Sequence, residues 1–187
     1  MKSRASGTIA VASRQVELFA REWSLQPHRW WYERDVAAEI SRRISDALGP
    51  RRSKVPFDDL ETYSEPHCSC GHAGRVRIDH PIYGWDKVRY PKRPDIVIHP
   101  DDPEDPYPWV CEIKVGSTPR KDLNGVSDEE KVLRLLGGPR PVVLAGTVLD
   151  MRIPTPPRLR GSVSRSFSLG GRLTKYFVEA RQPNPNV

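Results

Sequence analysis

The sequence predicts an α/β fold in which helices flank a mixed β-sheet. Two observations lead to this expectation. Apolar side chains have helical spacing near the N-terminus, and the middle of the chain holds short apolar runs bounded by turn residues, with a further helical segment near residue 130. After an N-terminal helix, the predicted order is helix, strand, strand, strand, helix, strand. At 187 residues the chain is long enough to bury a core, and it is most simply one domain with decorated ends.

Two helices are predicted in the N-terminal part of the chain. The first spans residues 13–23, where the apolar positions recur at helical spacing. These positions are Val16, Phe19, Ala20 and Trp23. Pro27 separates this helix from a second one in "YERDVAAEISRRISDALGP", which ends at Gly49-Pro50. Residues 50–74 have few periodic apolar positions, so we expect a loop or a small inserted element there.

Three strands are predicted next, at about residues 75–79, 94–99 and 108–115. The connector "PDDPEDPYP" between the second and third strands is rich in prolines and acids. It therefore predicts a solvated loop or the end of a hairpin.

The C-terminal third predicts a helix, a buried strand and a hairpin. Ser127 is a suitable N-cap for a helix that reaches about residue 136 and ends at Gly137-Gly138. "RPVVLAGTVL" predicts the buried strand. "SVSRSFSLGGRLTKYFVEA" alternates around Gly170-Gly171 and predicts the hairpin.

Charge is unevenly distributed along the chain, whose net charge is +6. Residues 1–55 hold 11 Lys and Arg against 6 Asp and Glu, and residues 151–187 hold 7 against 1. Residues 56–150 hold 12 against 17. An acidic centre between basic ends is what a metal site flanked by phosphate-binding surfaces would produce, although a surface without such a role can have the same distribution.

Two further features of the sequence indicate the cellular compartment. Three cysteines do not make a disulfide scaffold, and an odd number argues against a secreted, oxidised protein. Apolar runs in the sequence all fall well short of the roughly 20 residues that cross a bilayer. We therefore expect a cytoplasmic protein with no membrane partner.

Charged residues interrupt two of the predicted strands. Asp95 lies in "KRPDIVIHP", and Glu112 and Lys114 lie in "PWVCEIKVG". Residues two apart in a strand share a face, so Glu112 and Lys114 point together while Cys111 faces the other side. If the two strands pair, Asp95 and Glu112 lie side by side, and a hard divalent cation relieves their repulsion. The alternative is a surface salt bridge between Glu112 and Lys114.

The second predicted helix carries another acid in an unexpected position. At about 100° per residue, Glu33 lies at the centre of the apolar stripe, whereas Asp35 and Glu39 fall on the solvent side. A carboxylate that faces the core needs a partner. The alternative is simple exposure in the first helical turn, where negative charge favours the helix dipole. Glu39 replaces Glu33 as the candidate if the helix register differs by about one turn.

These residues, in this order, resemble the PD-(D/E)xK nuclease superfamily, which has the restriction-endonuclease-like fold. The resemblance lies in Glu33 of "YERDVAAEI", Pro94-Asp95 of "RPDIVIH" and Glu112-Ile113-Lys114 of "CEIKV". It covers about residues 30–148, with the core order αβββαβ. The "ERDV" opening is similar to the first helix of archaeal-type Holliday-junction resolvases.

The resemblance implies a metal-dependent endonuclease that hydrolyses phosphodiester bonds of nucleic acid, with DNA as the expected substrate and RNA as the alternative. It implies that Asp95 and Glu112 bind Mg²⁺ or Mn²⁺, with the backbone carbonyl of Ile113 nearby. Lys114 would position or activate the attacking water, and Glu33 would complete the ligand shell or bind a second ion. The connector offers other carboxylates in place of Asp95, namely Asp101, Asp102, Glu104 and Asp105.

The resemblance also divides the chain into regions. Residues 1–28 are an N-terminal helical extension, and residues 29–150 are the nuclease-like core with a loop insert at about 50–74. Residues 151–187 are a basic C-terminal hairpin and tail. Proteins of this superfamily often act as homodimers or within larger nucleoprotein complexes, so either arrangement is expected here. A catalytically silent subunit that binds nucleic acid or supports assembly is the alternative function.

The predicted insert contains a group of zinc-ligand residue types. They are His67, Cys68, Cys70 and His72. A zinc ion would stabilise a loop that has no hydrophobic core of its own. A zinc-stabilised interaction module is therefore a second alternative function. The C-x-C spacing is tighter than the usual C-x₂₋₄-C, and this favours a polar loop with reduced thiols.

Basic residues cluster in two places that would suit contacts with phosphates. The first cluster comprises Arg42, Arg43, Arg51, Arg52 and Lys54, and the second comprises Arg165, Arg172 and Lys175. A solvated charged face is the alternative for both.

Overall fold

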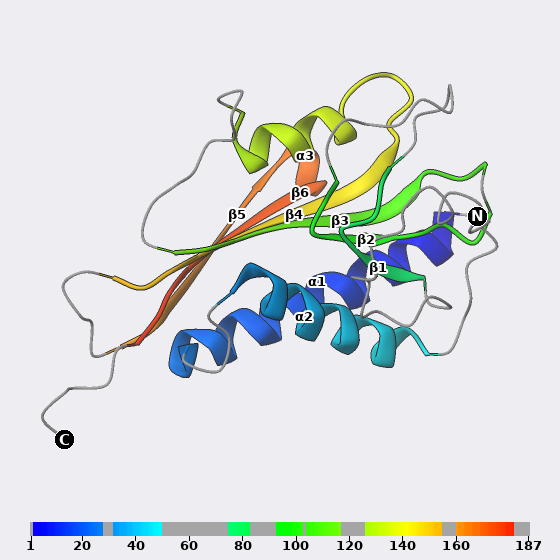
Figure 1. Ribbon diagram of the computed structural model, residues 1–187. Helices are drawn as coiled ribbons and strands as arrows, with labels where there is room; N and C mark the ends of the chain where they lie inside the picture. The colour runs from blue at the N-terminus through cyan, green and yellow to red at the C-terminus, as the bar shows by residue number, and fades with distance from the viewer. Residues whose placement is uncertain are drawn as a thin grey trace, which may run out of the picture.

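The computed structural model describes residues 2–27, 32–49, 75–82, 93–102, 104–116, 126–154 and 160–181. Figure 1 shows the elements in these ranges. In chain order they are α1 (Lys2–Leu25), α2 (Glu33–Leu48), β1 (Val76–Ile78), β2 (Ile96–Ile98), β3 (Tyr107–Val115), α3 (Asp128–Leu136), β4 (Val143–Arg152), β5 (Ser162–Ser168), the short 3₁₀ helix η3 (Leu169–Gly171) and β6 (Leu173–Glu179). The predicted α/β class with a mixed sheet between helices is confirmed.

The described sheet has six strands in the order β1-β2-β3-β4-β6-β5. β1, β2 and β3 form an antiparallel meander, and β4 runs parallel to β3. β6 runs parallel to β4, and β5 pairs with β6 as an antiparallel edge strand. β3 therefore lies inside the sheet between an antiparallel and a parallel neighbour.

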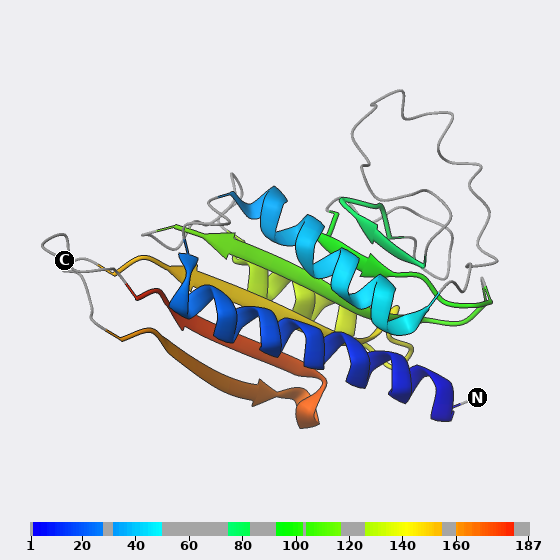
Figure 2. The ribbon, with the colours of Figure 1, turned by 90° about the horizontal axis from the view of Figure 1, so that it is seen from below.

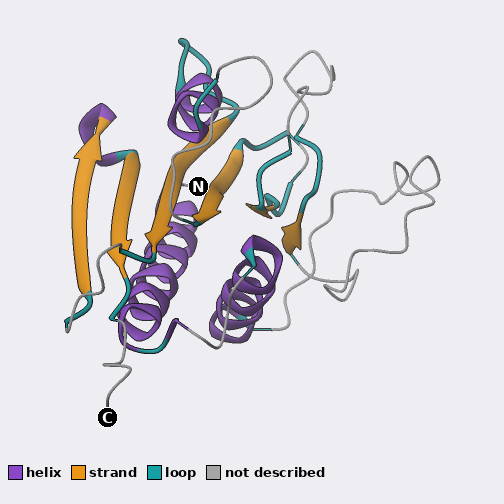
Figure 3. Cartoon of the chain, turned by 60° about the vertical axis from the view of Figure 1, so that its left-hand side comes forward, coloured by secondary structure: helices purple, strands orange, loops and turns teal. Residues whose placement is uncertain are grey.

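Helices cover the two faces of the sheet unequally. α1 and α2 lie side by side on one face, and α3 lies on the other (Figures 1 and 2). Figure 3 shows the same layers from another side. Side chains on β3 alternate between the two faces, because Trp109, Cys111 and Ile113 pack with α1 and α2 whereas Val110 packs with α3.

The first helix is longer than the sequence predicts. It begins at Lys2 rather than near residue 13, so that boundary is wrong. The reason is that its buried face continues toward the N-terminus with small side chains, Thr8 and Ala12, at a spacing of four residues from Val16. Among the described residues, no helix is both long and apolar enough to cross a membrane.

The C-terminal hairpin is present where the sequence predicts it. η3 makes the turn, and Gly170 and Gly171 have φ values of 62° and 86°, which favour glycine. β6 contributes Tyr176 and Val178 to the core that also contains Trp23 of α1. The hairpin is therefore part of the main sheet and shares the core of the N-terminal helix.

Candidate functional site

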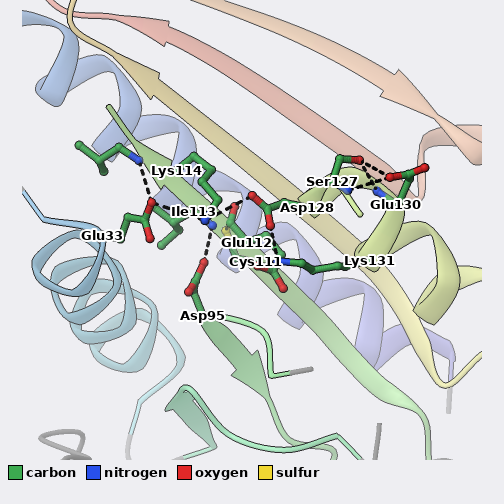
Figure 4. Close-up of polar contacts among 11 residues, drawn as sticks. Glu33, Asp95, Cys111, Glu112, Ile113, Lys114, Ser127, Asp128, Glu130 and Lys131 are labelled. Atoms are coloured by element: carbon green, nitrogen blue, oxygen red, sulfur yellow. Dashed lines mark hydrogen bonds and ion pairs between the residues drawn. The ribbon is translucent and has the colours of Figure 1, made fainter. Parts of the chain in front are cut away.

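Two predicted carboxylates meet the edge of β3. The described pairing of β2 with β3 ends at Cys111. Further along β3, the N–H of Ile113 donates to Oδ2 of Asp95 at 2.6 Å, and the N–H of Val115 donates to Oε1 of Glu33 at 3.4 Å. Figure 4 shows these contacts. Asp95, just before β2, and Glu33, at the start of α2, therefore both approach the edge of β3.

Asp95 and Glu112 form a carboxylate pair at this position. The antiparallel register, in which Ile96 faces Cys111, places Asp95 opposite Glu112. Glu112 is buried, with 4% of its surface exposed, and Asp95 is half-buried. Burial raises the pKa of Asp95, although the hydrogen bond from Ile113 opposes this change. Burial and the charge of Asp95 raise the pKa of Glu112. Two such carboxylates repel each other unless a proton or a cation joins them.

Two lysines and a third buried acid surround this pair. Nζ of Lys114 lies 3.5 Å from Oε1 of Glu33 and 3.5 Å from Oδ2 of Asp128. Asp128 also accepts a hydrogen bond from Lys131 through Oδ1. Nζ of Lys131 lies 3.7 Å from Oε2 of Glu112. The contacts thus run from Glu112 through Lys131, Asp128 and Lys114 to Glu33 (Figure 4).

Lys131 keeps its charge in this setting. Burial lowers the pKa of Lys131, but the hydrogen bond to Asp128 and the charge of Glu112 outweigh burial and hold the pKa above its ordinary value. Lys131 therefore acts as a fixed cation beside the carboxylates.

Helix α3 places Asp128 and Lys131 over the sheet. Ser127 caps the helix as the sequence predicts, and with Glu130 it forms a complete capping box. α3 also approaches β4 closely, since a Cβ on Gly146 would lie 2.2 Å from Cγ1 of Val132. The glycine thus sets how near the acid and the lysine of α3 come to Glu112.

Asp128 and Lys131 were not among the residues predicted from the sequence. For Asp128, the pattern of apolar residues in α3 does contain a signal. The side chain of Asp128 is only 7% exposed. At about 100° per residue, Asp128 lies about 40° from Val132 and about 20° from Leu135 around the helix axis. It therefore sits in the apolar stripe, as Glu33 does in α2. The same search for acids on core-facing stripes, applied to α3, would have found it.

The exposure of the acids on α2 differs from the prediction. Glu33, predicted to face the sheet, keeps 41% of its side chain exposed but reaches Lys114. Glu39 was expected on the solvent side, which is wrong, since its side chain is 18% exposed. The reason is that Glu39 accepts from Arg42 and Arg43, and Arg43 also binds Glu22 of α1. The hydrogen bond from Arg42 lowers the pKa of Glu39.

The acids of the connector lie at the other end of the β2–β3 hairpin. Asp101 contacts Arg75 at 3.4 Å, and Oδ1 of Asp102 accepts the N–H of Glu104. Asp105 belongs to the same connector, which precedes β3, whereas Glu112 lies near the end of that strand. The strand length separates these acids from Glu112, so Asp95 is the better partner.

The predicted phosphate-binding residues that the structure describes contact groups of the chain itself. Arg165 lies 3.4 Å from Glu17, and Lys175 lies 2.8 Å from Glu129. Arg172 donates to two carbonyl oxygens at the start of β4. Arg42 and Arg43 are held by the acids described above. Their role toward nucleic acid stays a prediction.

Several predicted residues lie outside the described ranges. They are Arg51, Arg52 and Lys54 of the first basic cluster and the four zinc-ligand candidates His67, Cys68, Cys70 and His72. Within the ranges that the structure does describe, no three His, Cys, Asp or Glu side chains are grouped as they would be around a metal ion.

The donor set at Asp95 and Glu112 nevertheless suits Mg²⁺, which takes one or two carboxylates and completes its shell with water and substrate phosphate. Of the described side chains in the network, four are carboxylates and two are ammonium groups, which leaves a formal charge of −2. They are Glu33, Asp95, Glu112, Asp128, Lys114 and Lys131. A divalent cation balances this charge. The role of the Ile113 carbonyl stays a prediction.

In comparisons with protein-family models, curated proteins and solved structures, the chain has no match. Its function is therefore inferred from the sequence motif and from the contacts of this site.

Proposed function

We propose that the protein is a metal-dependent nuclease with a restriction-endonuclease-like core, which hydrolyses phosphodiester bonds of nucleic acid and prefers DNA. The observation that carries this proposal is the pairing of β2 with β3, which brings Asp95 opposite Glu112 with Lys114 two residues further on. The order α2, β1, β2, β3, α3, β4, with β4 parallel to β3, supports it because it agrees with the order αβββαβ.

Each residue of the site has a distinct task in this reaction. Asp95 and Glu112 would hold Mg²⁺ or Mn²⁺, and when bound such a cation neutralises phosphate charge and lowers the pKa of the attacking water. Lys114 donates hydrogen bonds, so its ammonium group can orient that water or bind a phosphate oxygen. Glu33 and Asp128 restrict where this ammonium group points.

One observation favours a catalytically silent subunit instead. Lys114 and Lys131 both have carboxylate partners within the chain, and together they connect α2, β3 and α3. A network of this kind can serve stability alone. A protein that binds nucleic acid without cutting it would then carry the same contacts.

The proposal is tested by incubating the protein with plasmid, linear, branched and single-stranded DNA and with RNA, in Mg²⁺, Mn²⁺ or EDTA. We expect cleavage that requires the metal and is strongest on DNA. Asp95→Asn keeps an acceptor for the Ile113 N–H but removes the charge, and Lys114→Met removes the ammonium group. Each should slow cleavage at least about 100-fold.

Asp102→Asn is the matched control, because it removes a carboxylate from the exposed connector and should leave cleavage unchanged. Thermal unfolding of every variant separates loss of chemistry from loss of folding. If the wild type binds DNA but cuts none of the substrates with either metal, the silent subunit is the correct assignment. Equal rates for Asp95→Asn and Asp102→Asn would also contradict the nuclease.

A further inference from the structure

The ammonium group that contacts Glu112 comes from α3. Nζ of Lys131 lies 3.7 Å from Oε2 of Glu112, whereas Lys114, the lysine of the sequence motif, pairs with Glu33 and Asp128. The side chain of Lys131 is 17% exposed and that of Glu112 is 6% exposed. Water therefore has little access to this contact, and Lys131 rather than Lys114 is the described ammonium group at salt-bridge distance from Glu112.

A divalent cation at Glu112 would compete with this ammonium group. Two cations that approach the same buried carboxylate repel each other, so a metal bound to Glu112 would weaken its contact with Lys131. Asp128 already receives Lys131 through Oδ1 and is itself 7% exposed. Lys131 thus already has a buried anion that can hold it when its contact with Glu112 is lost.

The geometry of α3 suits this role of Asp128. Asp128 and Lys131 are three residues apart and so are neighbours on one face of the helix. The capping box of Ser127 and Glu130 holds the first helical turn, which contains Asp128. The acceptor therefore stays in place while the long lysine side chain moves.

We propose that Lys131 bridges Asp128 and Glu112 in the metal-free protein, and that Asp128 is a positioning residue that retains Lys131 when a divalent cation binds at Glu112. This inference rests on the proposed metal centre. It assigns Asp128 an effect on metal binding that acts through Lys131 rather than through direct contact with the metal.

The test is calorimetric titration of the full chain with MnCl₂ at constant pH, which needs no nuclease activity. Lys131→Met removes the competing cation and should tighten Mn²⁺ binding about tenfold, and Asp128→Asn should weaken it about tenfold. The double variant decides the mechanism. If Asp128 acts through Lys131, the double variant binds within about threefold of Lys131→Met.

Two controls define the site. Asp95→Asn should abolish Mn²⁺ binding, which shows that the heat comes from the proposed centre. Glu129→Gln removes a carboxylate from the same turn of α3 and should leave affinity unchanged. Thermal unfolding confirms that each variant is folded.

The outcomes separate the inference from the proposed function. If the double variant matches the wild type because the two effects simply add, Asp128 acts by its charge alone and the inference is wrong. It is also wrong if both single variants bind like Glu129→Gln, although the metal centre then stands. If the wild type binds no Mn²⁺, or if Asp95→Asn binds it normally, the proposed metal centre fails and the inference fails with it.

Discussion

At the scale of single residues, Asp95 and Glu33 have a structural task as well as a proposed chemical one. They accept the N–H groups of Ile113 and Val115 beyond the described end of the β2–β3 pairing. Leaving a buried N–H without an acceptor costs about 1–3 kcal/mol. Alanine variants would therefore mix folding with chemistry, whereas Asp95→Asn and Glu33→Gln keep an acceptor and remove only the charge.

We expect the metal-free protein to lose stability as the pH rises. The pKa of Asp95 is raised to about 6 and that of Glu112 to about 8, mainly by burial. Because both pKa values are higher in the folded state than in the unfolded state, the stabilising contribution is complete below about pH 4 and falls as the pH passes through these values.

Thermal unfolding in EDTA measures this effect. The Tm should fall between about pH 5 and about pH 9, and Glu112→Gln should remove the part of the decrease above about pH 7. Identical pH profiles for the wild type and Glu112→Gln would show that the burial of this carboxylate has no energetic consequence.

At the scale of elements, the docking of α3 on the sheet completes the site. Gly146 lets Val132 approach β4, and the capping box at Ser127 starts the helix where Asp128 faces inward. A side chain on Gly146 has no room unless Val132 or the helix that carries it shifts. The ion-pair network around Glu112 therefore depends on Gly146, although β4 contributes no residue to that network.

Gly146→Ala should destabilise the protein by about 1–3 kcal/mol, because the new methyl group overpacks the contact with Val132. Gly7→Ala is the contrasting variant, since a Cβ there meets nothing within 4 Å and the residue lies within α1. It should stabilise the protein by about 0.5–1 kcal/mol. Urea denaturation measures both effects, and equal stabilities for the two variants would contradict this account of α3 docking.

At the scale of the whole molecule, the C-terminal hairpin and the N-terminal helix belong to one core. β6 lies between β4 and β5, and its buried Tyr176 is in the cluster that contains Phe19 and Trp23 of α1. Gly161, just before β5, has no room for a Cβ beside the carbonyl of Ser24. The two ends of the described chain thus share the core between α1 and the sheet, and we expect them to unfold together.

Substitutions of two aromatic residues in the hairpin test whether it unfolds together with the rest of the protein. Tyr176 is 1% exposed and Phe167 is 58% exposed. Tyr176→Ala should cost about 3–5 kcal/mol, whereas Phe167→Ala should change stability by less than about 1 kcal/mol. Tryptophan fluorescence and far-UV circular dichroism should follow one unfolding curve in each protein. A separate transition for the hairpin would show that it is an independent unit.

Much of the candidate site could be predicted from the sequence because it depends on local geometry. The two-residue period of a strand places Glu112 and Lys114 on one face and Cys111 on the other. The short connector before β3 predicts that this strand turns back on the one containing Asp95. Ser127 marks the start of α3 through its own capping chemistry. These inferences need only neighbours along the chain.

The order of the elements and the mixed sheet thus follow from the sequence, and so does the meeting of Asp95 with Glu112 once their two strands are assumed to pair. Which lysine or arginine contacts which carboxylate depends on the tertiary packing. Lys131 rather than Lys114 contacts Glu112, and Glu39 belongs to an interface between α1 and α2. Such pairs depend on how closely helices dock on a sheet, which is set by side-chain volumes on several elements at once. A pattern along one segment does not contain that information, because the energy of a buried ion pair depends on distances and on exclusion of water.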